Sequence, residues 1–337
     1  MDLRALALLA VLATPAGADT LRLTTWDPGL SREGPGLLLR DIAAHAPQVM
    51  AAAQVIAATR PDAILLTGFD WDLDGRALIG FADLLAELGY PMPHRFAAQP
   101  NRGLQTGRDL DGDGQAGGPR DAQGFGDFTG QRGLALLSRL PVGPVIDHSA
   151  FLWRDLPGHR MPVLDHGDIR RLSSAAHWDI ALETEAGPLH LLALSATPPV
   201  FELQNVARNH DEVTFWLHHL PDAPFAVIGN LNLDPLDGDG DAEALAALAR
   251  VTQDPQPRGA WQPPQSGPNV GHRGDPALDT AEYERSPGNL RLDYILPAQG
   301  LEVAGSGVVW PAPDDPLAAA ATLASRRKLV WVDLVLE

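Results

Sequence analysis

The sharpest candidate for a chemical site is an apolar segment that ends in closely spaced polar residues. Residues 225–229 are apolar or small, and Asn230, Asn232 and Asp234 follow them at alternate positions. α/β proteins place ligands at such strand ends, because side chains can converge there without leaving polar groups buried and unpaired. The pattern predicts a polar ligand site directly after a strand at 225–229.

A run of alternating carboxylates in the polar stretch after residue 99 indicates a second kind of chemistry. The run comprises Asp109, Asp111 and Asp113. Alternating carboxylates followed by Gly114 are typical of the first half of a calcium loop, where the glycine permits a sharp turn. The twelfth position is Arg120 rather than glutamate, which excludes an EF-hand. Two interpretations remain open: a calcium site closed by Asp121 or Asp127, and a metal-free polar loop.

Several common catalytic signatures do not occur in the sequence. It has no cysteine, which excludes disulfides, thiolate metal sites and cysteine nucleophiles. It also has no P-loop, no Gly-x-Ser-x-Gly turn, no His-Glu-x-x-His pair and no paired-glycine dinucleotide turn. Any chemistry must therefore use oxygen and nitrogen groups.

The elements that must position these residues are read from hydrophobic periodicity. Apolar runs predict strands at 21–26, 63–66, 133–138, 171–182, 189–194, 225–229, 292–296, 300–310 and 328–336. Helical spacing predicts helices at 35–58, 76–88, 201–220 and 316–323. Residues 99–130 and 250–289 are loop-rich. Strands outnumber helices, and the helices come in separated groups, which predicts two packed mixed sheets with helices outside.

The charge of the chain argues against polyanionic partners. The sequence holds 25 Lys and Arg residues against 43 Asp and Glu residues, which gives a formal net charge of −18. Non-specific nucleic-acid binding depends on basic side chains that neutralise phosphates. We therefore do not expect nucleic acid to be a partner.

The first eighteen residues have the pattern of a cleavable signal peptide. Arg4 gives a basic start, residues 5–13 are apolar, and small residues precede a cleavage point after Ala18. The apolar run is well below the ~20 residues needed to span a bilayer, and no later stretch is long and apolar enough to do so. We expect a domain at 19–337 that acts in the periplasm or as a secreted protein, with no membrane span.

Residues 229–235, Gly-Asn-Leu-Asn-Leu-Asp-Pro, resemble the Gly-Asp-x-Asn-x-Asp-Pro motif of the endonuclease/exonuclease/phosphatase family. Four further segments resemble strands of that family in the same order, namely residues 21–26, 60–66, 291–296 and 329–333. The insertion near 99–130 resembles that of a secreted bacterial branch, and a second loop-rich insertion lies near 250–289. The resemblance implies a four-layer α/β/β/α sandwich of two mixed sheets and divalent-metal-dependent hydrolysis of phosphoesters.

The resemblance also implies a set of site residues, most of which are replaced in this sequence. The family holds Mg²⁺ or a similar hard ion on carboxylates and uses a histidine with an aspartate partner to handle protons. The replacements are Asp27 for an asparagine, Gly68 for the metal-binding glutamate, Arg132 for a tyrosine, Ser195 for a histidine, Asn230 for an aspartate, and Arg326 and Arg327 for the closing Asp-His. Asn230, Asn232 and Asp293 are then the remnant of the catalytic set, and Asp27 is the remnant of the metal site.

These replacements predict a loss of catalysis. Glycine has no side chain to bind a metal, asparagine supplies no charge, and arginine stays protonated at any working pH and cannot act as a base. We interpret the chain as an exported family member that is catalytically impaired or inactive. Its role would be to bind a small anion or phosphoester, or a partner protein.

Alternatives to this interpretation remain open. The three arginines at family positions either form a cationic pocket for phosphate or carboxylate, or salt-bridge Asp27 and neighbouring acids. They are Arg132, Arg326 and Arg327. A rearranged enzyme site would hold Mg²⁺ on Asp27 together with Asp70 or Asp72, which also fit an ordinary turn. A calcium-stabilised structural module would use the acidic loop.

Overall fold

Eleven strands form two sheets in the computed structural model, which describes residues 20–336. The predicted signal peptide at 1–18 lies outside the described residues. The six-stranded sheet contains β1 (Thr20–Trp26), β2 (Ala63–Phe69), β3 (His94–Phe96), β4 (Gly133–Ser138), β10 (Glu302–Val309) and β11 (Leu329–Val335). The five-stranded sheet contains β5 (Val142–Asp147), β6 (His177–Thr184), β7 (Gly187–Ser195), β8 (Phe225–Asn230) and β9 (Asp293–Pro297).

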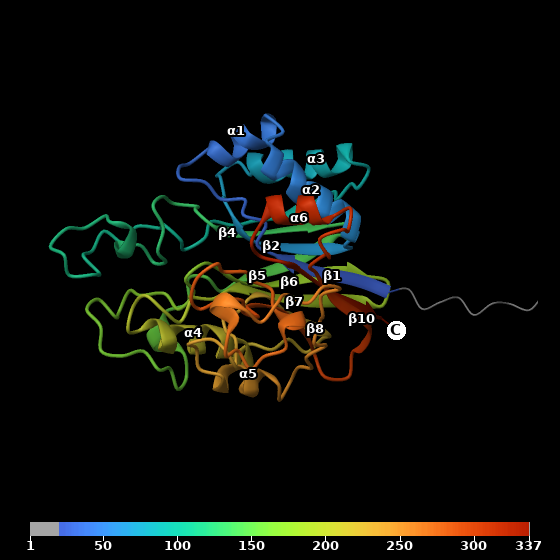
Figure 1. The fold of residues 1–337 in the computed structure, drawn as a ribbon. Coiled ribbons are helices and arrows are strands. Elements are labelled where there is room, and N and C mark those ends of the chain that lie inside the picture. The colour runs from blue at the N-terminus through green and yellow to red at the C-terminus, as the bar shows by residue number, and fades with distance from the viewer. Residues whose placement is uncertain (1–19, 337) are drawn as a thin grey trace, which may run out of the picture.

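Helices cover the outer face of each sheet, so the chain forms four layers (Figure 1). The helices on the six-stranded sheet are α1 (Leu37–Ala43), α2 (Pro47–Thr59), α3 (Arg76–Glu87) and α6 (Ala318–Ala324). Those on the five-stranded sheet are α4 (Asn205–Thr214), continued by the 3₁₀ turn Phe215–His218, and α5 (Glu243–Leu248). This arrangement confirms the predicted sandwich. Within residues 20–336 no helix combines the length and the apolar character that crossing a membrane requires.

Both sheets are mixed. The strand order is β10-β11-β1-β2-β4-β3 in one sheet and β5-β6-β7-β8-β9 in the other. β1 runs parallel to β2, and β7 runs parallel to β8, whereas the other neighbours are antiparallel. The inner faces of the sheets bury one apolar layer that includes Leu23, Leu65, Trp178 and Ile228. This layer holds the ends of β1, β2, β7 and β8 in fixed positions relative to one another.

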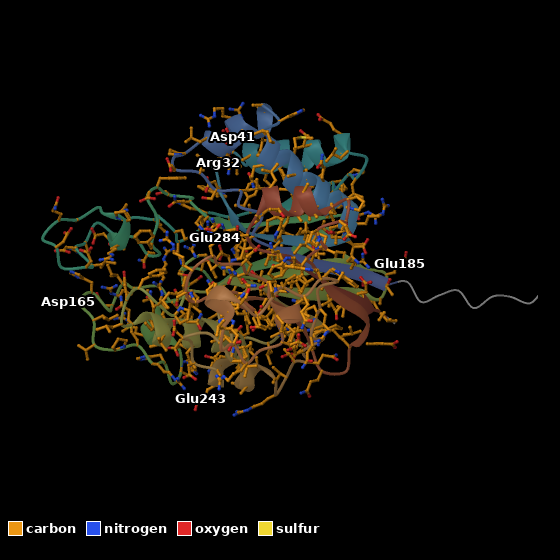
Figure 2. All side chains as sticks on the ribbon, viewed as in Figure 1. Arg32, Asp41, Asp165, Glu185, Glu243 and Glu284 are labelled. Carbon is orange, nitrogen blue, oxygen red and sulfur yellow. The ribbon has the colours of Figure 1, made fainter. Side chains whose placement is uncertain are left out.

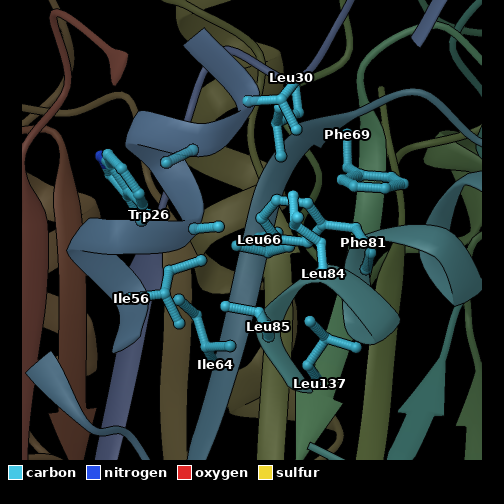
Figure 3. Close-up of a cluster of buried hydrophobic side chains, with 14 of the residues drawn as sticks. Trp26, Leu30, Ile56, Ile64, Leu66, Phe69, Phe81, Leu84, Leu85 and Leu137 are labelled. Atoms are coloured by element: carbon cyan, nitrogen blue, oxygen red, sulfur yellow. The ribbon is translucent and has the colours of Figure 1, made fainter. Parts of the chain in front are cut away.

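A second apolar layer joins the six-stranded sheet to its helices (Figure 3). Leu66 and Phe69 of β2 pack there with Phe81 and Leu84 of α3, and all four side chains are almost fully buried. The amphipathic spacing of α3 places its apolar side chains on this one face. Burying each such side chain contributes about 1.5–3 kcal/mol, which helps to offset the cost of the buried charges described below.

The structure corrects several element boundaries. The single helix predicted at 35–58 is two helices, because His45 adopts a left-handed backbone (φ 51°) and Pro47 starts α2 at its first turn. The helix predicted at 201–220 starts later, at Asn205, since Phe201 also has a positive φ of 74°. Three short elements, β3, β5 and α5, were not predicted.

The two loop-rich segments contain only isolated 3₁₀ turns and bridges among the described residues. Pro119–Asp121 lies in the first segment, and Gly267–Asn269 and Pro276–Leu278 lie in the second. A further 3₁₀ turn, Trp153–Asp155, lies between β5 and β6. The 99–130 segment projects from the side of the sandwich (Figure 1).

Candidate functional site

A cleft of about 560 Å³ opens where strands of both sheets end. β1 and β2 run parallel and bring Asp27 and Gly68 to its wall, and β7 and β8 run parallel and bring Ser195 and Asn230 to it. The loop after β8 adds Asn232, whose left-handed φ of 49° is one that asparagine tolerates well. The predicted ligand position beyond residues 225–229 is therefore part of a real cavity.

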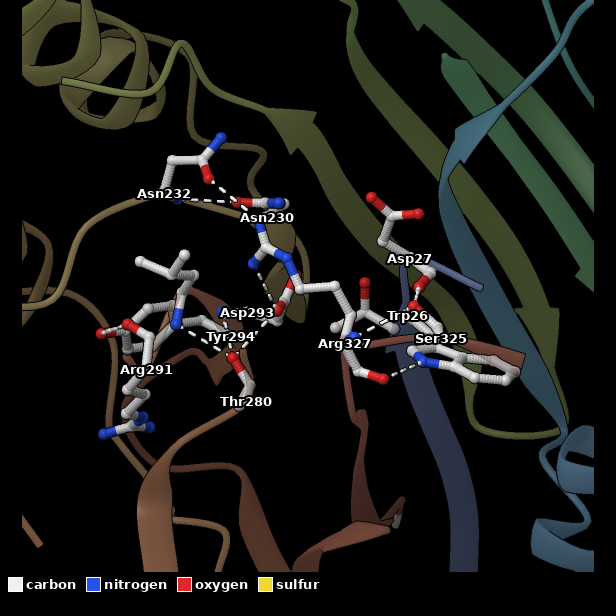
Figure 4. A network of polar contacts seen from close by, with 12 residues as sticks. Trp26, Asp27, Asn230, Asn232, Thr280, Arg291, Asp293, Tyr294, Ser325 and Arg327 are labelled. Atoms are coloured by element: carbon white, nitrogen blue, oxygen red, sulfur yellow. Dashed lines mark hydrogen bonds and ion pairs between the residues drawn. The ribbon is translucent and has the colours of Figure 1, made fainter. Parts of the chain in front are cut away.

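Arg327 is the cation that connects the residues predicted to be the remnant of the catalytic set. Its Nη1 donates to Asp293 Oδ2 at 3.0 Å, and its Nη2 donates to Asn232 Oδ1 at 3.2 Å (Figure 4). Asp293 is fully buried and also accepts a hydrogen bond from Thr280 Oγ1 at 2.9 Å. The Asn232 backbone N–H donates to Asn230 Oδ1 at 2.8 Å. A guanidinium thus occupies the centre of this group.

The segment that carries Arg327 is tied to the end of β1. Ser325 Oγ donates to the Asp27 carbonyl oxygen at 2.7 Å and accepts from the Arg327 backbone N–H at 3.0 Å. Trp26 Nε1 donates to the Arg327 carbonyl oxygen at 2.9 Å (Figure 4). The two bonds to Trp26 and Asp27 join residues 301 and 298 positions apart in the sequence, so the segment that carries the guanidinium is held by the tertiary fold.

Burial acts in opposite directions on the two members of this ion pair. Burial raises the pKa of the Asp293 carboxyl group, and Arg327 and Thr280 oppose that change. Burial lowers the pKa of Arg327, but the attraction of Asp293, with smaller contributions from Tyr283 and Asp27, outweighs it and raises the pKa. Arg327 therefore stays charged and has no lone pair to accept a proton from water or an alcohol.

Asp27, the predicted remnant of the metal site, is engaged by a second arginine. Arg132 Nη2 lies 2.5 Å from Asp27 Oδ2, and Asp27 is only 6% exposed. Arg132 has a left-handed backbone (φ 50°), held in part by its N–H donating to Asp70 Oδ1 at 3.0 Å. Arg132 therefore forms the salt bridge to Asp27 that was one of its two open alternatives, and it also lines the cleft.

Gly68 and Asp27 fit each other sterically. Gly68 has a positive φ of 75°, and a Cβ atom added there would lie 2.7–2.9 Å from the Asp27 carboxylate. A side chain at position 68 would therefore require the Asp27 carboxylate to move. The two predicted replacements are compatible with each other, because the Asp27 carboxylate fills the space that a side chain at position 68 would need.

The cleft does not fit a divalent cation. Within residues 20–336, the one group of three His, Asp or Glu side chains within metal-binding reach lies elsewhere, in the acidic loop. At the cleft, guanidinium groups already pair with Asp27 and Asp293. Both oxygens of Asp234, which also lines the cleft, accept backbone N–H groups. A metal ion would have to displace fixed cations to reach these carboxylates.

Three other predicted residues lie away from the cleft. The Arg326 side chain is 68% exposed and pairs at 3.1 Å with the exposed side chain of Glu284, which is labelled in Figure 2. Asp70 accepts backbone N–H bonds from Arg32 and Arg132, and Asp72 accepts them near the start of α3. Arg326 thus does not join an anion pocket, and neither aspartate joins Asp27.

The acidic loop brings together part of the predicted calcium set. Asp109, Asp111 and Asp121 can each place an oxygen within 4.8 Å of the others, whereas Asp113 is not in this group. Asp121 accepts hydrogen bonds from the backbone N–H groups of Leu110, Gly117 and Gly118, which lower its pKa. Asp121 is one of the two closing residues that the sequence suggested.

Arg102 is a site residue that sequence reasoning missed. It lies in the 99–130 segment, lines the cleft, and has a buried Nε without a hydrogen-bond partner among residues 20–336. Burial lowers the pKa of Arg102 to about 10, with the nearby charge of Arg132 adding to the effect. No local pattern marked it, because one arginine in a polar loop is ordinary.

Comparisons with known proteins agree with this fold. The sequence matches the family described as "Endonuclease/Exonuclease/phosphatase family" over residues 44–327. No curated protein matches the chain. An endonuclease/exonuclease/phosphatase from Beutenbergia cavernae shares 18% identity at a TM-score of 0.58, with 94% of this chain and 72% of that chain covered.

Two further solved structures are similar at low identity. A family protein from Leptotrichia buccalis has 14% identity and a TM-score of 0.57, with coverage of 93% and 99% of the two chains. A family protein from Bacteroides thetaiotaomicron has 12% identity and a TM-score of 0.52, with coverage of 95% and 99%. Similarity at this level shows the fold alone. With the family match over most of its length, the chain belongs to the endonuclease/exonuclease/phosphatase family.

Proposed function

We propose that this protein is an exported family member that no longer hydrolyses phosphoesters with a divalent metal and instead binds a small anion in its cleft. The observation that carries the proposal is the pair of guanidinium–carboxylate contacts, Arg132 with Asp27 and Arg327 with Asp293. Fixed cations there repel a metal ion and supply no base.

The loss of a catalytic base and of a metal ligand has a large effect on the rate of phosphoester hydrolysis. A positioned general base or acid contributes about 10²–10⁴-fold, and one preorganised electrostatic group contributes about 10²–10³-fold. Arginine at position 327 cannot act as the general base. Glycine at position 68 removes a ligand of the metal ion that would supply the electrostatic stabilisation. Together these losses reduce hydrolysis by about 10⁴-fold or more relative to an intact site.

The cleft retains donors that suit an anion. Arg102 has no carboxylate within 4.0 Å among the described residues, and Arg132 is 44% exposed with donors beyond the one used on Asp27. Guanidinium groups match the geometry of phosphate and carboxylate. A small anion therefore fits this cavity better than a nucleic acid fits a chain of net charge −18. The same donors could also bind a carboxylate on the surface of a partner protein.

The first prediction is that the purified protein shows no metal-dependent hydrolysis. The protein is purified from the periplasmic fraction of a bacterial host, where removal of residues 1–18 is read from its intact mass. Assays with Mg²⁺, Mn²⁺ and Ca²⁺ on bis-p-nitrophenyl phosphate and on DNA should stay at the no-enzyme background, with a commercial phosphodiesterase as positive control.

A rearranged active site makes the opposite prediction. It requires metal-dependent turnover that disappears in Asp27→Ala and persists in Asp83→Ala, a change at an exposed residue of α3. That pair of results would contradict our proposal. Anion binding in the cleft is tested separately by titrating the protein with inorganic phosphate in a calorimeter. The variant Arg132→Gln should bind phosphate more weakly than the unchanged protein.

Calcium stabilisation is a second candidate role, favoured by the grouping of Asp109, Asp111 and Asp121. If calcium binds there, the melting temperature rises by about 5 °C when free Ca²⁺ exceeds Kd about 100-fold, because the ion binds only the folded state. The double variant Asp109→Asn with Asp111→Asn should lose this rise. Asp113→Asn is the matched control, since Asp113 lies outside the group. An equal rise in the double variant, or none at about 10 mM Ca²⁺, contradicts this role.

A further inference from the structure

We propose that a second cavity, next to the cleft, binds an organic anion whose charged group meets arginine side chains and whose body is apolar or aromatic. The cavity has a volume of about 350 Å³ and lies between the 99–130 segment, the 197–205 segment and α4. This site is distinct from the cleft of the proposed function, because the cavity is lined mainly by residues that do not line the cleft.

The cavity gathers positive charge in a chain that is strongly acidic. Four arginines line it, and Glu202 is the one acidic residue in the same lining. These arginines are Arg102, Arg120, Arg170 and Arg208. Only Arg120 among them has a carboxylate within 4.0 Å in the described part of the chain, and that partner is Glu202 at 3.6 Å. The other three guanidinium groups lack an ion-pair partner there.

Nearby carboxylates do not supply ion-pair partners for these three guanidinium groups. Glu212 lies fully buried beside the cavity, and its oxygens accept the backbone N–H groups of Ser174 at 2.6 Å and Thr197 at 2.5 Å. Glu202, Asp165 of the adjacent loop (labelled in Figure 2) and Asp121 act on Arg170 only from beyond ion-pair distance. The cavity therefore keeps a positive charge that no described residue pairs directly.

The arginines are held in place by backbone carbonyl groups. Arg208 donates to the carbonyl oxygens of Leu172, Gln123 and Arg171 at 2.7–2.9 Å, and Arg170 donates to those of Asp165 and Leu110 at 2.8–3.0 Å. Burial lowers the pKa of both side chains. Fixed, partly desolvated cations without a counter-ion bind an anion at little ordering cost.

The rest of the lining is apolar and aromatic. Trp153 and Leu110 form part of the wall, and Phe125 and Phe201 stand at the cavity with exposed fractions of 57% and 87%. Exposed aromatic side chains beside a charged pocket suit a ligand with a flat or apolar body. Thr197 Oγ1, also in the lining, is buried without a hydrogen-bond partner among residues 20–336.

The two cavities meet at Arg102, Pro198 and Phe201, which line both. Residues private to each cavity therefore separate the two sites experimentally. Arg170 and Phe125 line only the second cavity, whereas Arg132 lines only the cleft. Variants at Arg170 or Phe125 therefore test binding in the second cavity, and a variant at Arg132 tests binding in the cleft.

The test uses naphthalene-2-carboxylate as probe and isothermal titration calorimetry on the purified protein. Binding should weaken about tenfold or more in Arg170→Gln, which removes a charge-assisted hydrogen bond. It should weaken about fivefold in Phe125→Ala, a change at an exposed position that leaves the fold intact. The matched control Arg154→Gln removes an exposed arginine outside both cavities and should change Kd less than about twofold. Naphthalene-2-methanol, the neutral analogue, should bind at least about tenfold more weakly.

Three results would overturn the inference. The first is no binding of the carboxylate up to about 5 mM, and the second is equal binding of the neutral analogue. The third is weakening by Arg132→Gln with no effect of Arg170→Gln or Phe125→Ala, which places the probe in the cleft instead. Loss of phosphate binding in the cleft, with the Arg170 and Phe125 effects intact, would count against the proposed function alone.

Discussion

Replacing Arg327 with methionine lowers the free energy of unfolding by about 3–5 kcal/mol, because it leaves the buried Asp293 carboxylate without its cation. Asp293 Oδ1 already lacks a hydrogen-bond partner among residues 20–336, so little remains to compensate the charge. Urea unfolding followed by circular dichroism at pH 7 measures the change. Methionine matches the length and apolar stem of arginine, which limits the loss of packing.

The pH dependence and a double variant identify the cause. Without Arg327 the pKa of Asp293 rises further, so the folded state takes up a proton more readily and the deficit shrinks as pH falls toward 5. Asp293→Asn combined with Arg327→Met should lose less stability than Arg327→Met alone. The control is Arg326→Met, whose exposed side chain pairs with an exposed glutamate. A loss below about 1 kcal/mol in Arg327→Met would contradict this account of the ion pair.

Replacing Asp279 with asparagine stabilises the protein at pH 8 by an amount of the order of 2–4 kcal/mol. Asp279 is 7% exposed, and burial together with three neighbouring carboxylates raises its pKa to about 7. These neighbours are Asp234, Asp237 and Asp275. A rise of the Asp279 pKa to about 7 corresponds to a destabilisation of about 4 kcal/mol at most when the group is ionised in both states. Asparagine removes the buried negative charge that causes the penalty.

The sign of this effect follows from the raised pKa. Below about pH 4 the Asp279 carboxyl group is protonated in both the folded and the unfolded state, so it contributes no penalty. Between about pH 4 and pH 7 the unfolded chain ionises while the folded chain holds its proton, and stability falls as pH rises. The advantage of Asp279→Asn should therefore grow over this range and level off above pH 7. Asp83→Asn, at an exposed position of α3, should show no such pH dependence.

Local patterns predicted the parts of the fold that local interactions specify. Apolar runs located β1, β2, β4 and β8 closely, because a buried strand shows its apolar character in the sequence itself. Helical spacing predicted one helix where the structure has α1 and α2, since the hydrophobic spacing continues across the left-handed His45. β5 was missed because most of its residues are exposed or only half-buried, as at an edge strand.

The candidate site was predicted only in part. Asn230, Asn232, Asp293 and Arg327 were each named from the family resemblance, and the structure places them together. Arg102 carried no signal, and Arg326 lies at the surface although it is adjacent to Arg327. Whether neighbouring side chains point to the cleft or to solvent depends on the path of the backbone through Ser325 and its bonds to β1.

The sequence by itself determined which chemical groups are present at the family positions. A glycine at position 68 offers no metal ligand and an arginine at position 327 offers no base, whatever the fold. Only the tertiary structure decided which charges neutralise each other. Arg132 meets Asp27 across 105 residues of sequence, while Arg102, Arg170 and Arg208 meet no carboxylate at ion-pair distance among the described residues. Ion pairing depends on distance in space and on burial, and neither is encoded in local periodicity.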